Sequence, residues 1–227
     1  RVFARGAENL QRLIDTGAMV REAAPSLYVY QQRMGDHVQA GLVAGASVDE
    51  YESDAIKKHE YTRRDKEDER THHVETLGAN TGPVFLTYPA RPEIDGLIDA
   101  VRADRPVYDF TSEDGIGHTL WVVAEPERVA TLREAFARVP TLYVADGHHR
   151  SAAATRVRAL RRAANPQHRG DEPYNYFLAV IFPHDQMKIM AYNRVVRDLA
   201  GMSPAHFRDR IAERFTLAPA RTPAPEN

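Results

Sequence analysis

An apolar run that ends in Asp146-Gly147-His148-His149-Arg150 constrains the fold of this chain most strongly. The run, residues 141–145, has the length and composition of a buried strand, and residues 151–164 follow a helical pattern. A buried strand therefore enters a helix through a tight turn. Strand and helix patterns elsewhere are mixed without strict alternation. Together these patterns predict an α+β (mixed α/β) fold, in which helices flank a mixed sheet.

The other elements are predicted from apolar spacing, capping residues and turn residues. Helices are expected at 3–14, 64–77, 94–101 and 126–138, with a short one after Ser47 and a last one at Ser203-Pro204. Thr62 is expected to cap the helix at 64–77, and Gly78 to end it. Strands are expected at 27–31, 38–48, 83–88, 107–111, 116–124, 176–182 and 187–196. In the helix after the turn, Ala153, Val157, Leu160 and Ala164 should face the core.

Size and composition limit the classes of protein to which this chain can belong. Its 227 residues are 43% hydrophobic and carry a net charge of −2, which gives no support for nucleic-acid binding. There is no Cys, so disulfides and thiolate chemistry are excluded. We expect a cytoplasmic protein without a membrane span. The sequence is compatible with a homo-oligomer. Three parts are predicted: an N-terminal α/β portion (1–115), a core containing the turn (116–216) and a Pro/Ala tail (217–227).

The chemistry of the turn indicates an oxyanion site, with phosphate as the favoured anion. The first amides of a helix are free and carry partial positive charge, which suits anions. Asp146 is expected to cap the helix, and Gly147 would let a ligand approach the backbone. His148, His149 and Arg150 would surround the anion, with Ser151 beside them. The alternative is an Asp-capped helix whose His and Arg side chains face solvent.

A second group of polar residues lies in the charged segment before the helix at 64–77. Glu60 is a candidate general base, and with His59 a candidate metal ligand, although an exposed charged turn is an equal alternative. Arg70 could reach an anion held near His59, whereas His72-His73 is expected on a solvated helix face. The secondary candidates are His59, Thr62, Arg70, Asn193 and Arg194. The spacings HExxH and GxSxG are absent, so a metallohydrolase and a serine hydrolase are disfavoured.

These residues also carry a resemblance to known families. The segment 143–154 (YVADGHHRSAAA), preceded by 127–140 (ERVATLREAFARVP), resembles the ParB/sulfiredoxin-like superfamily, and within it the free-serine kinases. Almost the whole chain is similar to the domain of unknown function 1015 proteins, which are described as SerK-like. The wider match includes residues 26–30, 56–70, 79–83 and 193–196.

The resemblance implies a mixed α/β core whose strand–DGHHR–helix turn holds nucleotide phosphates, and a phosphotransferase acting on a small hydroxyl compound such as free serine. ADP or ATP would be the cofactor, with Mg²⁺ as a further candidate. Asp146, His148 and Glu60 are the expected catalytic residues; Glu125 and Glu127 are other candidates for the acidic one. A nucleotide-sensing regulator of ParB-like type is the alternative, and a relic of the fold without activity is a third.

Overall fold

The computed structural model describes residues 2–190 and 196–219, and the chain forms two compact units, Arg1–Met187 and Lys188–Asn227. The predicted α+β class is confirmed. The helices are α1 (Val2–Asp15), α2 (Val48–Glu52), α3 (Arg64–Leu77), α4 (Pro92–Arg102), α5 (Pro126–Ala137), α6 (His148–Ala163) and α7 (Pro204–Ala212), with short 3-10 helices η1 (Pro173–Asn175) and η2 (His184–Gln186). The strands are β1 (Leu27–Met34), β2 (His37–Ser47), β3 (Ile56–Lys57), β4 (Val84–Tyr88), β5 (Tyr108–Thr111), β6 (Gly117–Val123), β7 (Leu142–Asp146) and β8 (Tyr176–Pro183).

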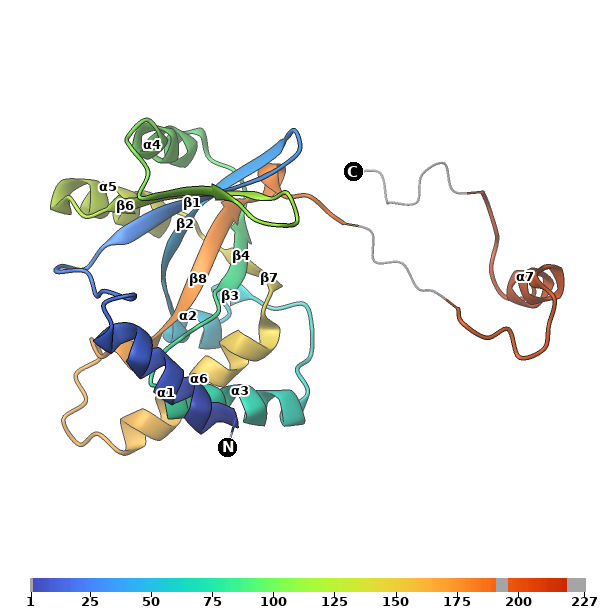
Figure 1. Ribbon diagram of the computed structural model, residues 1–227, viewed down its shortest axis with the longest axis horizontal. Coiled ribbons are helices and arrows are strands. Elements are labelled where there is room, and N and C mark those ends of the chain that lie inside the picture. Colours follow the sequence, from blue (N-terminus) through green and yellow to red (C-terminus); the bar gives the residue numbers. More distant parts are fainter. Residues whose placement is uncertain (1, 191–195, 220–227) are drawn as a thin grey trace. The chain divides into compact units, whose positions relative to one another are not determined.

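One mixed sheet in the larger unit contains all eight strands of the described residues, in the order β3-β7-β4-β8-β2-β1-β6-β5 (Figure 1). The pairs β3–β7 and β4–β8 are parallel, and the other pairs are antiparallel. The strands predicted at 27–31 and 38–48 are confirmed as β1 and β2, which form an antiparallel hairpin that turns at Gly35 with a positive φ of 58°. The sheet is continuous across residue 115, because β5 pairs with β6.

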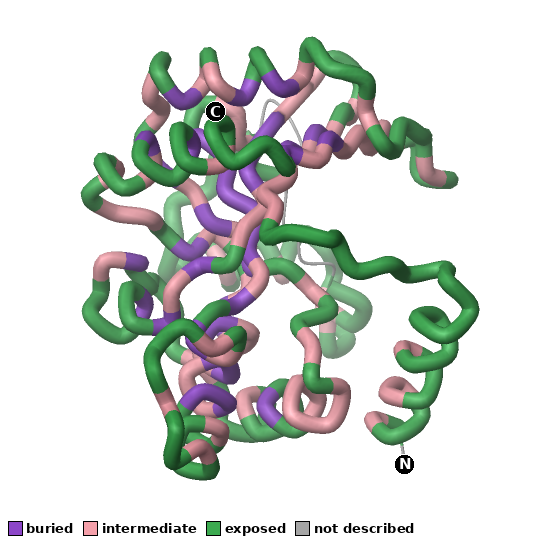
Figure 2. The backbone as a smooth tube through the Cα atoms, turned by 90° about the vertical axis from the view of Figure 1, so that its left-hand side faces the viewer, coloured by how far each residue is buried: buried purple, intermediate pink, exposed green. Residues whose placement is uncertain are grey.

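The core follows the central strands, where the buried residues gather (Figure 2). In β4, alternate residues Val84, Leu86 and Tyr88 are buried, as a strand with a period of two requires. Helix α4 contacts β1, β2 and β6, whereas α6 contacts β4, β8 and α3 (Figure 1). Helix α1 in turn contacts α3. The turn after β7 therefore lies where the sheet meets the α3–α6 pair.

The buried face of α6 differs from the predicted stripe. Ala153 and Val157 are buried as expected, but Leu160 is 54% exposed and Ala164 is exposed as well. Arg158 is buried instead, because it forms ion pairs with Asp49 (2.5 Å) and Glu52 (3.4 Å) of α2. Because the paired Arg158 is buried, the buried face of α6 differs from the face that the apolar spacing indicated.

The predicted strand at 187–196 is wrong for those of its residues that the structure describes. Strand β8 ends at Pro183, η2 follows, and Met187–Met190 form no strand. Proline has no N–H for a further ladder bond, which explains why pairing stops there. In the smaller unit, the predicted cap is confirmed: Ser203 Oγ accepts a hydrogen bond from His206 N–H (3.2 Å). Across 2–190 and 196–219, no helix is both long and apolar enough for a membrane span.

Candidate functional site

Gly147 makes the tight turn between β7 and α6 that the sequence predicts. It is the N-cap of α6, and its φ of 100° lies in the region that favours glycine. The guanidinium of Arg150 folds back over it: a Cβ at residue 147 would lie 2.9 Å from Arg150 Nη2 and 3.1 Å from Nε. The absence of a side chain at Gly147 therefore gives Arg150 its position.

Asp146 does not cap α6, contrary to the prediction. It is still part of β7, paired in register with Phe85, so its side chain comes one residue too early for the N-cap position. Its carboxylate instead accepts a hydrogen bond from Arg150 Nη2 at 2.7 Å. Asp146 thus anchors the guanidinium and holds it across the turn.

In the first turn of α6, some amides are hydrogen-bonded within the helix and others have no partner within it. Arg150 N–H and Ser151 N–H both donate to Gly147 O, at 2.8 and 3.0 Å. The amides of His148 and His149 precede them, where a helix offers no carbonyl partner of its own. Ser151 is fully buried, and its hydroxyl donates to His148 O (3.1 Å), so a ligand at the turn has no access to its side chain.

The structure brings His148 together with the predicted His59-Glu60 pair. The His148 side chain is only 4% exposed; its ring meets that of His59 edge-on, with ring centres 4.4 Å apart. Glu60 Oε2 lies 3.7 Å from His148 Nδ1. Burial, with help from His59, lowers the pKa of His148, although the Glu60 carboxylate opposes the shift. His148 is therefore a neutral imidazole at pH 7.

His149 and Thr62 connect the turn to the start of α3. Arg63 N–H donates to His149 Nε2 (3.1 Å), so a neutral His149 carries its proton on Nδ1. Thr62 does not cap α3 as predicted: the N-cap is Arg63, and the Thr62 hydroxyl donates to the Glu67 carboxylate. Because Arg63 is the N-cap, its N–H has no acceptor within α3. It donates to the His149 imidazole instead.

Beside the turn is a cavity of about 240 Å³, which two arginines and a histidine line. Arg150 enters it from α6, whereas Arg70 and His73 come from one face of α3. Thr81 and Gly82, in the loop before β4, complete the wall with other neighbours. Arg150 Nε is buried, and no other residue of the described chain accepts its hydrogen bond. The cavity wall thus gathers cationic side chains, and the unused Nε donor of Arg150 is buried beside Gly147.

The predicted residues therefore fall into two groups. His59 and Glu60 lie beside His148, and Arg70 shares a cavity with Arg150. Asn193 and Arg194 lie outside the described residues. Glu125 is the N-cap of α5 and Glu127 lies in its first turn; neither is an ion-pair or hydrogen-bond partner of the turn residues in the described chain.

His73, Thr81 and Gly82 line the cavity but are not among the site residues predicted from the sequence. His73 was expected in solvent, but it is half-buried, its ring packs against Phe3 of α1 (5.5 Å between centres), and it lines the cavity. The spacing of Arg70, His73 and Val74 on α3 is the pattern that could have revealed their common face. Within 2–190 and 196–219, no three His, Asp or Glu side chains are placed to hold a metal ion.

Comparison with known proteins places the chain in a family without assigning it an activity. A search of the curated proteins and a search of the solved structures found no match. A match to a family extends over residues 1–227, the full length of the chain. The chain therefore belongs to the family described as "Protein of unknown function (DUF1015)".

Proposed function

We propose that this chain is a phosphotransferase similar to the free-serine kinases, which binds the phosphates of ADP or ATP at the Gly147–Arg150 turn and phosphorylates a small hydroxyl metabolite such as serine. The observation that carries the proposal is the cavity lined by Arg70, His73 and Arg150 next to the start of α6. Phosphoryl transfer depends chiefly on positioning and on neutralisation of negative charge, and both needs match this arrangement.

The phosphate contacts follow from the groups that are free at the turn. The amides of His148 and His149 point out of the helix start, where its dipole favours an anion. Arg150 offers a planar fork whose Nε has no acceptor, and Arg70 adds a second guanidinium. Because Arg150 Nε is buried over Gly147, a shift of the side chain would have to expose it to a phosphate oxygen, while Nη2 could keep its bond to Asp146.

The acceptor would lie on the side of the turn where His148, His59 and Glu60 meet. In the proposed step, the acceptor hydroxyl oxygen attacks the terminal phosphorus of the nucleotide. The bond from this phosphorus to its bridging oxygen breaks, and AMP or ADP leaves with the electron pair. The hydroxyl proton passes to the Glu60 carboxylate, while His149, which is only partly buried, can donate a hydrogen bond from Nδ1 to the transferred group.

Mg²⁺ would supply further charge neutralisation if the nucleotide arrives as its magnesium complex. Mg²⁺ commonly binds through one or two carboxylates and the substrate phosphates, so the described residues need not provide a full set of ligands. Asp146 is the carboxylate at the turn, and it is mostly exposed. It is therefore the residue that would hold the ion together with the phosphates.

A regulator that binds nucleotide without turnover is the second candidate, and the state of Glu60 favours it. The Glu60 side chain is 60% exposed, and its distance of 3.7 Å from His148 Nδ1 is too long for a hydrogen bond. No other described residue donates a hydrogen bond to its carboxylate. A general base held so loosely is poorly prepared for proton transfer unless the substrate orders it.

Detection of phosphoserine by ³¹P NMR, after incubation with serine and ADP or ATP, separates the two candidates. We expect phosphoserine with the native chain and none with Arg150→Ala, which should also lose ADP binding in calorimetry. Glu60→Gln should bind ADP normally but form product about 10²-fold more slowly or worse. Glu69→Gln, on the exposed side of α3, is the matched control and should match the native chain.

ADP binding without phosphoserine would favour the regulator over the enzyme. Unchanged ADP affinity in Arg150→Ala would contradict the phosphate site itself, and so would a native chain that binds neither nucleotide.

A further inference from the structure

A second cavity lies next to the first, between α3 and α6. It has a volume of about 90 Å³, and it shares Val74 and Asn80 with the wall of the arginine-lined cavity. Both cavities lie within the larger unit. Together they reach about the lower end of the 300–1,000 Å³ that ligand pockets occupy. We call the two neighbouring cavities the α3–α6 crevice.

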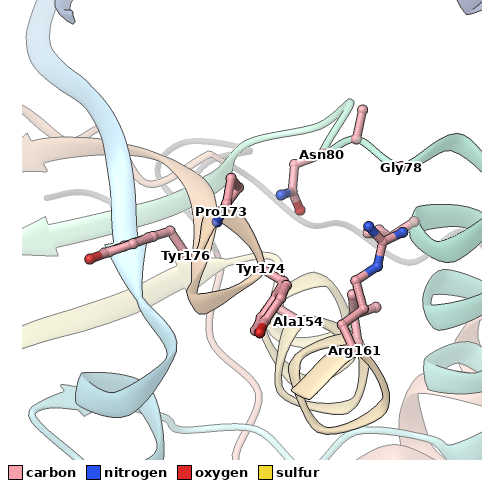
Figure 3. Close-up of a pocket in the computed structure, with 10 residues that line it drawn as sticks. Gly78, Asn80, Ala154, Arg161, Pro173, Tyr174 and Tyr176 are labelled. Atoms are coloured by element: carbon pink, nitrogen blue, oxygen red, sulfur yellow. The ribbon is translucent and has the colours of Figure 1, made fainter. Parts of the chain in front are cut away.

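The chemical character of the crevice changes along its length. The end at the turn is cationic, with Arg150 and Arg70, whereas the far end is formed by Tyr174, Pro173 and the apolar side of α6 at Ala154 and Val157. Figure 3 shows Asn80, Tyr174 and Arg161 around this far end, while the ring of Tyr176 extends away from them. Arg161 is paired with Glu75 at 2.7 Å, just as Arg150 is paired with Asp146 at the other end of the crevice.

Tyr174 is held in place by its neighbours. Its hydroxyl accepts a hydrogen bond from Asn165 Nδ2 (3.0 Å) and bonds to His168 Nδ1 (2.9 Å), and the two rings are stacked with centres 5.8 Å apart. The Glu172 carboxylate accepts hydrogen bonds from the amides of Arg169 and Gly170, which fixes the loop before Tyr174. Burial raises the pKa of Glu172, but these hydrogen bonds outweigh it and lower the pKa to about 2. A rigid aromatic ring of this kind is a good platform for a planar group.

The length of the crevice fits a ligand with an anionic and an aromatic end. Arg150 and Val157 are seven residues apart on α6, which corresponds to about 10 Å along the helix. Residues 150, 153, 154, 157 and 161 of α6, at three- and four-residue spacing, form one continuous wall. Phosphates at the turn would thus leave the rest of a nucleotide beside this wall.

We propose that the α3–α6 crevice holds the nucleoside part of the phosphate donor, with the base against Tyr174 and with Asn80 as its hydrogen-bonding partner. This inference rests on the proposed function, because it takes the phosphates to be at Arg150. It gives Tyr174 and Asn80 a role in determining nucleotide specificity. Along α6, the base would lie farthest from the turn, the phosphates at the turn, and the acceptor beyond them beside His148.

Calorimetry with ADP and with pyrophosphate tests the crevice separately from the phosphate site. Tyr174→Ala should weaken ADP binding about tenfold, the scale of lost stacking on a base, and leave pyrophosphate binding unchanged. Tyr174→Phe keeps the ring but loses the hydroxyl bonds to Asn165 and His168, so it should bind ADP less tightly than the native chain and more tightly than Tyr174→Ala. Asn80→Ala should also weaken ADP alone. Arg150→Ala should weaken both ligands.

Two results would overturn the proposal while leaving the phosphate site intact. One is native ADP affinity in Tyr174→Ala when Arg150→Ala loses it. The other is equal weakening of ADP and pyrophosphate in Tyr174→Ala, which would show a structural effect on the turn. If the native chain binds neither ligand, the proposed function fails first, and the crevice proposal fails with it.

Discussion

Gly147 fixes the position of Arg150 through two separate properties. Its positive φ admits the sharp turn from β7 into α6, and its missing side chain leaves room for the guanidinium that folds over it. Asp146 then holds that guanidinium at 2.7 Å. The positive φ of Gly147, its missing side chain and the Asp146 carboxylate together place the Arg150 cation beside the free amides of the helix.

Gly147→Ala is therefore expected to harm both stability and binding. The backbone strain should cost about 1–3 kcal/mol, measured as the free energy of unfolding in urea, and displacement of Arg150 should lower ADP affinity. Gly35→Ala is the matched control: its φ is also positive, at 58°, but nothing lies within 4 Å of the added Cβ. It should lose stability and keep its ADP affinity. Native ADP affinity in Gly147→Ala would refute this view of the turn.

His148 should make the fold sensitive to acid. Its pKa is lowered in the folded state, chiefly by burial, from an ordinary value of 6.5, so the unfolded chain binds the proton more tightly. The stability due to neutral His148 is present above pH 6.5 and is lost as the pH falls through the lower, folded-state pKa. Tm should thus decline toward pH 5.

His148→Gln removes this titration, so its Tm should fall less steeply between pH 6.5 and 5 than that of the native chain, whatever its absolute stability. His206→Gln changes an exposed residue of α7 and should leave the native slope. If His148→Gln and the native chain show the same slope, burial of His148 does not control the acid response.

Helices α3 and α6 form the frame that holds both halves of the site. Arg156 of α6 pairs with Asp68 of α3 at 2.5 Å, and Arg161 pairs with Glu75 at 2.7 Å. Val157 lies between them in sequence and is buried. Exposed ion pairs contribute little to stability, whereas buried apolar area contributes more, so apolar packing should dominate the frame.

Val157→Ala should consequently reduce the free energy of unfolding by about 2 kcal/mol, through lost burial and a residual cavity. Arg156→Ala should reduce it by less than about 1 kcal/mol. Urea denaturation of the two variants provides the comparison. A larger loss in Arg156→Ala would show that ion pairs, and not packing, hold α3 against α6.

Most elements could be predicted because their causes are local. The helix at 64–77 ends at Gly78, which is left-handed in the structure, and Ser47 and Ser203 cap their helices through their own side chains. Two of the errors arose where a distant contact decides the outcome. Arg158 is buried only because α2 offers two carboxylates, and Arg63 N–H is bonded by His149, 86 residues away. Apolar spacing contains no information about either contact.

At the scale of the whole molecule, three distant segments supply the candidate site. They are the segment around Glu60, the stretch from Arg70 to Gly82, and the turn with α6. The sequence predicted the turn itself, because its strand, glycine and helix are contiguous. The cavity could not be predicted in the same way: His73 and Gly82 meet Arg150 only after α3 packs on α6 and β4 joins the sheet beside β7.

The most direct test of the central claim is a crystal structure of the chain with saturating ADP. Phosphate oxygens should lie within hydrogen-bond distance of the Arg150 guanidinium and the His149 amide, and the base should lie beside Tyr174. ADP bound elsewhere in the molecule, with the Gly147–Arg150 turn free of phosphate, would contradict this claim.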